Sequence, residues 1–228
     1  MHTSLELNEF SLVELERDDL DLIALQYLAH RLRATLNRLE EHGRYITPLI
    51  YHWKEPHQRV HRVVLYKNPS AFREQSLSFV GFLSKKQSLI PPTINHDIVS
   101  IDKVLVAELA ANSWLLSYSS MELADGNWCN LVVFNHSNAK AHIKSGSAHM
   151  HAAYQLAPHY YEWIRLHNGI MNAGLEQEQL MIRSTKYYTF HQQTSAPQGS
   201  PHEILQPSIR ERHYAEQERK TADGSTTV

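Results

Sequence analysis

The chain has 228 residues, 42% of them hydrophobic, and its 22 basic and 24 acidic side chains leave a net charge of −2 with histidine neutral. This length favours one domain with appendages, and it is enough to bury a core without a disulfide or a metal. The near-even charge argues against a sequence-independent grip on nucleic-acid phosphates, and the single cysteine, Cys129, excludes an intramolecular disulfide and a cysteine-rich zinc site.

The N-terminus and the hydropathy pattern predict where the protein resides. No apolar run approaches the roughly 20 residues that a membrane span requires. The first residues (MHTSLE) lack the basic and apolar segments of a signal peptide. We therefore expect a cytoplasmic protein with no membrane and no nucleic-acid partner.

The first predicted element is a helix over residues 11–42. Ser11 followed by Glu14 is a capping-box pattern, and Gly43 stands where a glycine commonly ends a helix. Leucines at three- and four-residue spacing make one apolar stripe along it: Leu25, Leu28, Leu32, Leu36 and Leu39. Such a stripe needs a partner surface. We expect an N-terminal helical extension, residues 1–43, that covers either the body of its own chain or a second copy.

Charge is unevenly spread along the chain. The net charge is −5 over residues 1–42, +4 over 43–191 and −1 over 192–228. An acidic extension docked on a mildly basic body fits this distribution, and a solvated acidic helix fits it equally well.

Residues 44–76 are predicted to connect this helix to the core and to contain one strand. Pro48, Pro56 and Pro69 interrupt any long element. The β-branched run over residues 60–66 (VHRVVLY) is typical of a strand.

From residue 77 the predicted elements alternate in order. Apolar runs and turn signals predict strands over 77–83, 114–123, 128–134, 160–167 and 180–191, with helical pieces over 97–111, 138–145 and 148–156. The order from 77 to 168 is β-α-β-β-α-β, the ferredoxin-like arrangement. We therefore predict an α+β fold with a ferredoxin-like core over 77–191, including an extra C-terminal strand.

One face of the predicted sheet is covered by its two helices, and the other needs a cover. Both faces of the strand over 160–167 carry large side chains, so neither is a plain solvent face. A second copy's sheet or the N-terminal extension satisfies this requirement. The polar, proline-containing residues 192–228 are predicted to form a flexible tail, with a short helix over 209–218 as the alternative.

The stretch 114–151 resembles the dimeric α/β-barrel superfamily, and within it the antibiotic-biosynthesis-monooxygenase-like proteins. The resemblance lies in the strand LLSYSSMEL, the Asp125-Gly126 turn, the strand WCNLVVF and the helical segment HIKSGSAHMHAA with its Ala148-His149 step. It implies a homodimer whose sheets pack together as a barrel, with a ligand cavity between each sheet and its helices. The activity it implies is a cofactor-independent monooxygenase of secondary metabolism.

Haem-degrading members of the superfamily also resemble this chain in outline. Those members use an asparagine on the first strand, a tryptophan at the end of the third and a haem-ligating histidine on the second helix. Here the third strand ends in Phe134 and the first offers Ser78, so that only His149 or His151 matches. This departure argues against haem degradation and leaves haem binding as an alternative.

Three residues are predicted to carry the chemistry. His149 is the expected general base, and Asn130 and Arg165 are expected to orient the substrate. The predicted substrate-binding residues around them are Trp114, Tyr118, Trp128, His151, Tyr161 and His167.

Structural alternatives remain open for each of these residues. Residues two apart on a helix point about 200° apart, so at most one of His149 and His151 faces a pocket. The strand face of Tyr161, Arg165 and His167 suits an aromatic or anionic ligand, and it suits an interface between copies as well. Asn130 equally fits a hydrogen bond to a neighbouring loop.

No metal or cofactor is predicted. Gly146 interrupts the helix between His142 and His149, and no H-E-x-x-H pattern accompanies His57 and His61. Cys129 is expected to be a buried inert thiol.

Three classes of function follow from the sequence. The first is a small-molecule enzyme resembling the cofactor-independent monooxygenases. The second is a non-catalytic module that binds a small-molecule ligand, with haem as one possibility. The third is an interaction protein whose N-terminal helix and C-terminal tail recruit partners.

Overall fold

The computed structural model describes residues 6–42, 46–73, 76–136, 139–177, 179–190 and 208–214. The chain is an α+β protein built on one eight-stranded antiparallel sheet. The strands are β1 (Leu49–Lys54), β2 (Val60–Leu65), β3 (Leu77–Lys86), β4 (Leu115–Glu122), β5 (Trp128–Phe134), β6 (Tyr161–Met171), β7 (Leu180–Thr189) and β8 (Ser208–His213). The α-helices are α1 (Glu6–His42), α2 (Pro92–Leu109), α3 (Ala139–Ser145), α4 (Ser147–His151) and α5 (Ala157–Tyr160).

The strand order of the sheet is β1-β2-β4-β5-β3-β6-β7-β8, and every neighbouring pair is antiparallel. The four middle strands, β4-β5-β3-β6, are those that alternate with α2 and with α3 to α5 along the chain. The hairpin of β1 and β2 extends this set beyond β4. Strands β7 and β8 extend it beyond β6.

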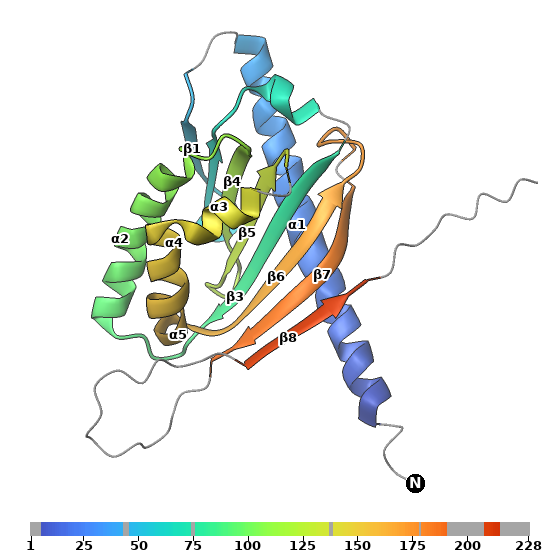
Figure 1. Cartoon of the computed structure of the whole chain (residues 1–228), viewed down its shortest axis with the longest axis vertical. Coiled ribbons are helices and arrows are strands. Elements are labelled where there is room, and N and C mark those ends of the chain that lie inside the picture. The colour runs from blue at the N-terminus through green and yellow to red at the C-terminus, as the bar shows by residue number, and fades with distance from the viewer. Residues whose placement is uncertain are drawn as a thin grey trace, which may run out of the picture.

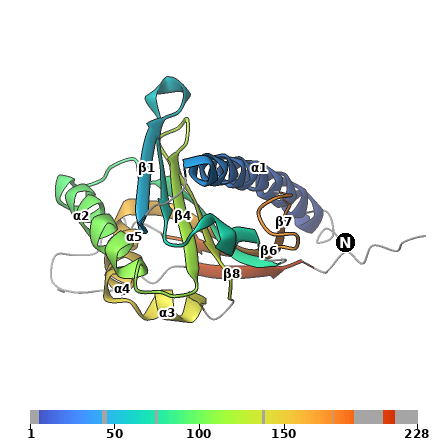
Figure 2. The same ribbon diagram turned by 90° about the horizontal axis from the view of Figure 1, so that it is seen from above.

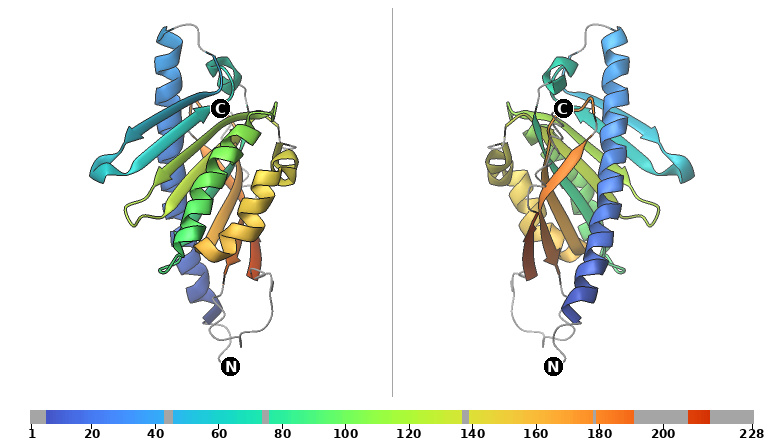
Figure 3. Two further views of the ribbon diagram at one scale, coloured as in Figure 1. Left: turned by 90° about the vertical axis from the view of Figure 1, so that its left-hand side faces the viewer. Right: turned by 90° about the vertical axis from the view of Figure 1, so that its right-hand side faces the viewer.

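Helices cover both faces of the sheet. Helix α1 runs along one face, while α2, α3, α4 and α5 lie on the other (Figures 1 and 2). Views from the two sides show α1 as the one α-helix among the described elements on its face (Figure 3). We call these the α1 side and the helix-pair side of the sheet. The two sides are separate environments because the sheet lies between them.

The α1 side is closed by the leucine stripe. The stripe residues are at most 7% exposed, and they pack with residues from β2 to β6 in one apolar cluster. The helix approaches β3 at Gly81, where a Cβ atom would lie 2.5 Å from Leu25 Cδ1. Burying a leucine side chain contributes roughly 1.5–3 kcal/mol, so the stripe is a major part of the core. The surface that this stripe covers therefore belongs to its own chain.

The second helical layer is irregular near Pro158. A π-helical turn, η3 (Ala152–Leu156), joins α4 to α5, and Pro158 lies in the first turn of α5. The sequence predicts that the helix stops before this proline. The helix continues to Tyr160 because the wider turn and the fresh start of α5 place the proline where a missing N–H costs little.

The segment over 44–76 contains two strands rather than one. Besides β2 it forms β1, which pairs with β2 through the hairpin at η1 (Pro56–Gln58), and a 3₁₀ turn, η2 (Pro69–Arg73). Leu49, Tyr51 and Trp53 alternate with more exposed residues, the two-residue period of an edge strand. Pro48, Pro56 and Pro69 lie outside both strands. Because prolines usually interrupt regular elements, their presence in the sequence favours a loop over the alternating pattern of β1.

The C-terminal part also differs from expectation where it is described. Residues 208–213 form β8 against β7, although the sequence predicts a flexible tail or a short helix there. Apart from Tyr214, the remaining residues of that predicted tail lie outside the described ranges. Within the described residues, no helix combines the length and apolarity needed to cross a membrane.

Candidate functional site

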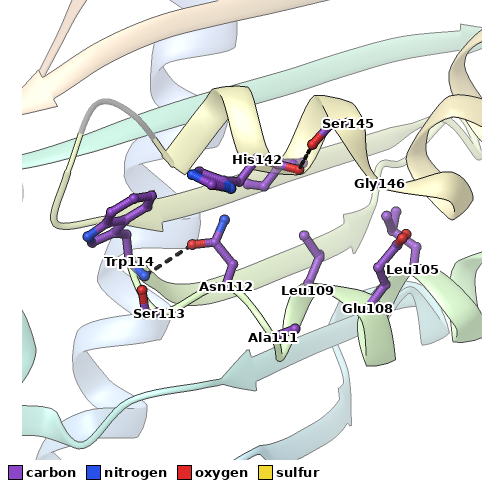
Figure 4. A pocket seen from close by; sticks show the side chains of 11 residues that line it. Leu105, Glu108, Leu109, Ala111, Asn112, Ser113, Trp114, His142, Ser145 and Gly146 are labelled. Carbon is purple, nitrogen blue, oxygen red and sulfur yellow. Dashed lines mark hydrogen bonds between the residues drawn. The ribbon is translucent and has the colours of Figure 1, made fainter.

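A pocket of about 310 Å³ opens between the end of α2 and the helices α3 and α4 (Figure 4). Its lining residues come from the end of α2, the turn into β4, and the segment from α3 to the start of α4: Leu105, Glu108, Leu109, Ala111, Asn112, Ser113, Trp114, His142, Ile143, Ser145 and Gly146. We call it the Trp114 pocket. It lies on the helix-pair side of the sheet.

The indole of Trp114 is one wall of this pocket. The ring centroid of His136 lies 5.4 Å from it in a stacked arrangement, and that of His142 lies 4.9 Å from it at a tilt of 57°. The backbone N–H of Trp114 donates to Asn112 Oδ1 at 3.0 Å, and Asn112 Nδ2 donates to the carbonyl of Ala139 at 3.3 Å. Asn112 thus connects the turn before β4 to α3, which fixes the spacing of the two walls.

Glu108 forms the opposite end of the pocket and also holds α4 in place. Its carboxylate accepts from the backbone N–H groups of Ser147, at 2.7 Å, and Ala148, at 2.9 Å. A Cβ atom on Gly146 would lie 2.9 Å from this carboxylate, so glycine is what permits the approach. Two backbone donors offset much of the charge of Glu108. The pocket therefore has an apolar wall and, at its end, the carboxylate of Glu108, which already accepts two backbone hydrogen bonds.

Two predicted site residues on the helix-pair side have buried polar atoms that lack partners. Asn130 Oδ1 and His149 Nδ1 form no hydrogen bond within the described part of the chain. Burial lowers the pKa of His149, the nearby Lys144 adds to this, and Glu108 opposes it. A neutral His149 near pH 7 agrees with the predicted general base, although His149 is not among the lining residues of the pocket.

The other predicted residues on this side lie apart from the pocket, except Trp114. Tyr118 contacts Arg62, whose guanidinium forms a two-pronged ion pair with Asp102, at 2.6 and 2.8 Å. Burial raises the pKa of Tyr118 to about 12, and the charge of Asp102 adds to this. Trp128 packs under the ammonium of Lys86.

His151 and Tyr161 also have partners of their own. His151 Nδ1 lies 2.7 Å from Gln155 Oε1 on the next helical turn. Tyr161 packs edge-on against Phe82, with ring centroids 5.6 Å apart. Neither residue lines the Trp114 pocket.

Arg165 and His167 lie on the opposite side of the sheet from Asn130 and His149. Arg165 donates to both oxygens of Asp21 on α1, at 2.5 and 2.7 Å, and His167 Nε2 lies 2.8 Å from Asp21 Oδ2. His167 Nδ1 lies 2.8 Å from Thr185 Oγ1. Asp21, His167 and Thr185 are all buried. The predicted set of His149, Asn130 and Arg165 is therefore divided by the sheet and does not meet in one site.

A second carboxylate cluster attaches the other part of α1. Glu55, after β1, accepts from the Tyr27 hydroxyl and from Trp53 Nε1, each at 2.7 Å, and forms an ion pair with Arg31. His61 Nδ1 lies 2.9 Å from Glu55 Oε1, and the His61 ring is fully buried. Burial opposes ionisation of Glu55, but the hydrogen bonds from His61, Tyr27 and Trp53 lower its pKa to about 2. We call the groups around Asp21 and Glu55 the two clasp clusters.

The clasp clusters share a composition that the sequence did not reveal. Each combines a carboxylate, an arginine over a tryptophan ring and a buried histidine. Asp21 and Arg165 are 144 residues apart, so no local spacing marks the pair. A signal did exist at Asp21, because a carboxylate stands four residues before Leu25 at the edge of the leucine stripe. Both clusters serve to fix α1.

No group of three or more His, Cys, Asp or Glu side chains among the described residues is arranged to hold a metal ion. The histidine pairs considered in the sequence do not belong to such a group. His57 is in the turn at η1, whereas His61 is inside the Glu55 cluster.

Comparison with known proteins gave no match: no protein-family model, no curated protein and no solved structure resembles this chain closely enough to be reported. The resemblance to the dimeric α/β-barrel superfamily therefore remains a prediction from the sequence.

Proposed function

We propose that this protein binds a small planar molecule in the Trp114 pocket. The observation that carries the proposal is the pocket itself: about 310 Å³, walled by Leu105, Leu109, Ile143 and the face of Trp114. Ligand pockets are typically apolar concavities of about 300–1,000 Å³ with a few polar groups that orient the ligand. Here His142 and Glu108 stand at the two ends and supply those groups.

Oxygenase activity is a further proposal on the same side of the sheet. Its support is the half-buried imidazole of His149, three residues beyond the pocket-lining Gly146, with an unpaired Nδ1 within the described residues. Arg165 has no part in this version, because Asp21 engages its guanidinium across the sheet. We favour binding over catalysis. Catalysis of this kind needs a base in contact with a second catalytic group, and the described residues that line the pocket contain no such pair.

The four middle strands of the sheet are β4, β5, β3 and β6. We propose that β3, α2, β4, β5, the helices α3 to α5 and β6 form a ferredoxin-like unit, and the support is their order of β4-β5-β3-β6 in the sheet. A homodimer of the barrel type, in which two sheets meet face to face, would need the surface that α1 occupies. That form of dimer therefore requires α1 to leave.

The binding proposal is tested by nuclear magnetic resonance with a set of one- and two-ring aromatic fragments: phenols, indoles, quinolines and benzoates. The four tryptophans each give one indole N–H signal, and Trp114→Phe identifies the relevant one. We expect at least one fragment class to shift the Trp114 signal saturably. If no fragment shifts it, the proposal is wrong.

A matched pair of variants localises the effect. Ala111→Trp adds a ring at a pocket-lining position, and Ala107→Trp adds the same ring at an exposed position of α2 outside the lining. We expect Ala111→Trp to weaken binding at least about tenfold, a loss of 1.4 kcal/mol or more, while Ala107→Trp leaves it unchanged. Equal binding by both variants would place the fragment elsewhere.

Oxygen uptake with the bound fragment then separates catalysis from binding. If the oxygenase version holds, uptake occurs in the parent protein and disappears in His149→Ala, whereas fragment affinity is retained. Binding without uptake supports the non-catalytic version.

A further inference from the structure

Glu108 is the one Asp, Glu, Lys or Arg side chain among the described residues that line the Trp114 pocket. Its hydrogen bonds come from uncharged groups: the backbone N–H groups of Ser147 and Ala148, and the Ser147 hydroxyl at 3.3 Å. None of the ion pairs among the described residues includes Glu108. Neutral donors stabilise a carboxylate and leave its charge in place. The lining therefore carries one negative charge while His142 is neutral.

The end of α2 adds to this negative character. The pocket lies beside the last turn of this 18-residue helix, with Leu105, Glu108 and Leu109 in its lining. The C-terminal end of a helix carries a partial negative charge, which basic side chains in the last turn commonly offset. The last turn of α2 contains no basic residue. A ligand with a positive group would therefore be stabilised at this end of the helix.

The indole of Trp114 provides a third attraction for a positive charge. The face of an aromatic ring is electron-rich, and tryptophan attracts cations most strongly among the aromatic side chains. The other three tryptophans each have a cation of the chain over the ring: Arg31 on Trp53, Lys86 on Trp128 and Arg165 on Trp163. Trp114 packs against the imidazoles of His136 and His142 instead. Among the described residues, no lysine or arginine lies over its ring.

Helix α3 carries two lysines, and neither lines the pocket. Lys140 Nζ donates to Asn168 Oδ1 at 2.9 Å and lies over the ring of Phe134, outside the lining. Lys144 is also absent from the lining residues. An anionic ligand would therefore meet the carboxylate of Glu108 without a lysine or arginine of the lining to balance its own charge.

We propose that the ligand of the Trp114 pocket is a planar organic cation, with its ring system against the indole of Trp114 and its positive group beside the carboxylate of Glu108. The inference rests on the proposed function, since it names the charge of the molecule that the pocket binds. Figure 4 shows these two side chains at opposite ends of the lining, so a ligand that reaches both spans the pocket (Figure 4). A cation that leaves water needs a counter-charge, and Glu108 supplies it.

Probes of matched shape and different charge test the inference on the parent protein. The probes 1-methylquinolinium, quinoline and quinoline-4-carboxylate share one fused ring system and are cationic, neutral and anionic at about pH 8, where histidine is ordinarily neutral. Their dissociation constants are measured from the Trp114 indole N–H signal. We expect 1-methylquinolinium to bind at least about tenfold more tightly than quinoline, and the carboxylate to bind most weakly. Added salt should weaken binding of the cation and leave binding of quinoline unchanged, because screening acts on charged pairs.

A charge-removing variant assigns the preference to Glu108. Glu108→Gln removes the negative charge and keeps one acceptor oxygen, so the preference for the cation over quinoline should fall below about threefold. The matched control is Glu162→Gln, the same change at a half-exposed residue outside the lining. It should leave the preference as it is in the parent protein.

Glu108 also holds the start of α4, so a second variant keeps its carboxylate in place. Ser113→Lys adds a positive charge at an exposed lining position and should weaken 1-methylquinolinium binding at least about tenfold, with little effect on quinoline. Leu89→Lys adds the same charge at a position that is 79% exposed and lies before the start of α2, outside the lining. It should leave both affinities unchanged.

The failure of this inference and the failure of the proposed function give different results. Equal binding of 1-methylquinolinium and quinoline, or tighter binding of the carboxylate, would overturn the inference and leave the proposed function standing. The same holds for a preference that survives Glu108→Gln and for a cation affinity that Ser113→Lys does not change. If neither these probes nor any other fragment shifts the Trp114 signal, the proposed function is wrong and the inference falls with it.

Discussion

Asp21 and Glu55 are buried carboxylates that stabilise the structure by connecting α1 to the sheet. Each contacts groups from other parts of the chain: β6 for Asp21, and α1, β1 and β2 for Glu55. Charges are rarely buried without a partner, because leaving one unpaired costs several kcal/mol. These contacts therefore specify where α1 lies, in addition to the apolar stripe that drives it onto the sheet.

Asp21→Ala should lower the free energy of unfolding by about 3 kcal/mol, because it leaves Arg165 and His167 buried without their carboxylate. The measurement is urea unfolding followed by circular dichroism. The control is Glu162→Ala, which removes a half-exposed ion pair with Lys85 and should cost less than about 1 kcal/mol. Equal losses in the two variants would show that the Asp21 cluster contributes no more than a surface pair.

Stability should fall as the pH is lowered, in two windows. Burial lowers the pKa of His61 below its ordinary 6.5, so the unfolded chain takes up that proton first and stability starts to fall below pH 6.5. The pKa of Glu55 is about 2 in the folded chain against an ordinary 4.5, so its stabilisation is present above pH 4.5 and is lost between pH 4.5 and 2.

Urea unfolding at a series of pH values checks this, with Glu55→Gln as the comparison. The variant should be less stable at pH 7 and should lose less stability than the parent between pH 4.5 and 3. Parallel curves for the two proteins would show that Glu55 titrates normally in the folded chain.

At this scale the sequence indicates which residues carry unusual chemistry better than it indicates their neighbours. The strand face of Arg165 and His167 is unusual in the sequence, and in the structure these residues form a cluster with Asp21 of α1 rather than with Asn130 and His149. Alternation along a strand says which residues share a face. It does not say which distant helix covers that face.

Gly81 determines how closely α1 packs on β3. A Cβ atom there would lie 2.5 and 2.7 Å from the two methyl carbons of Leu25, so α1 would have to shift or Leu25 would have to move. Glycine in a strand interior commonly marks such a close approach. The close contact between α1 and β3 therefore depends on the absence of a side chain at position 81.

A double-mutant cycle between Gly81→Ala and Leu25→Ala should show strong coupling. Each single variant is expected to destabilise the protein, Gly81→Ala by overpacking and Leu25→Ala by about 2–5 kcal/mol through a cavity. Together they should cost less than the sum by roughly 1 kcal/mol or more, since the new methyl group enters the space that Leu25 vacates. Additive losses would mean that α1 does not rest on Gly81.

Some elements are readable from the sequence and others are not, for physical reasons. The leucine stripe predicts a helix over residues 11–42; the helix begins at Glu6, and the stripe residues are buried. Strand β8 (SIRERH) carries no apolar pattern, because it pairs with β7 through backbone hydrogen bonds while most of its side chains face water. Strand β1 shows a clear two-residue period, but the prolines on either side of it favour a loop.

Across the whole molecule, the sheet separates two different surfaces. The α1 side holds the largest apolar cluster and both clasp clusters, in which Asp21 and Glu55 contact buried histidines. The helix-pair side divides its apolar residues between two smaller clusters and contains the Trp114 pocket. This asymmetry is why a ligand is expected on the helix-pair side.

The class of fold was predictable because it depends on element order, which periodicity reveals. The location of the pocket was not, because it is formed by the end of α2, a turn and α3, which are brought together only by folding. Trp114 was the one predicted substrate-binding residue that lines it. The other predicted substrate-binding residues form their contacts elsewhere in the fold.

The most direct test of this account is a crystal structure of the protein soaked with the aromatic fragment that shifts the Trp114 signal most. We predict electron density for the fragment against the Trp114 ring, between His142 and Glu108, with α1 unmoved on the other side of the sheet. A fragment bound instead between α1 and the sheet, or an empty Trp114 pocket at saturating concentration, would contradict the proposed function.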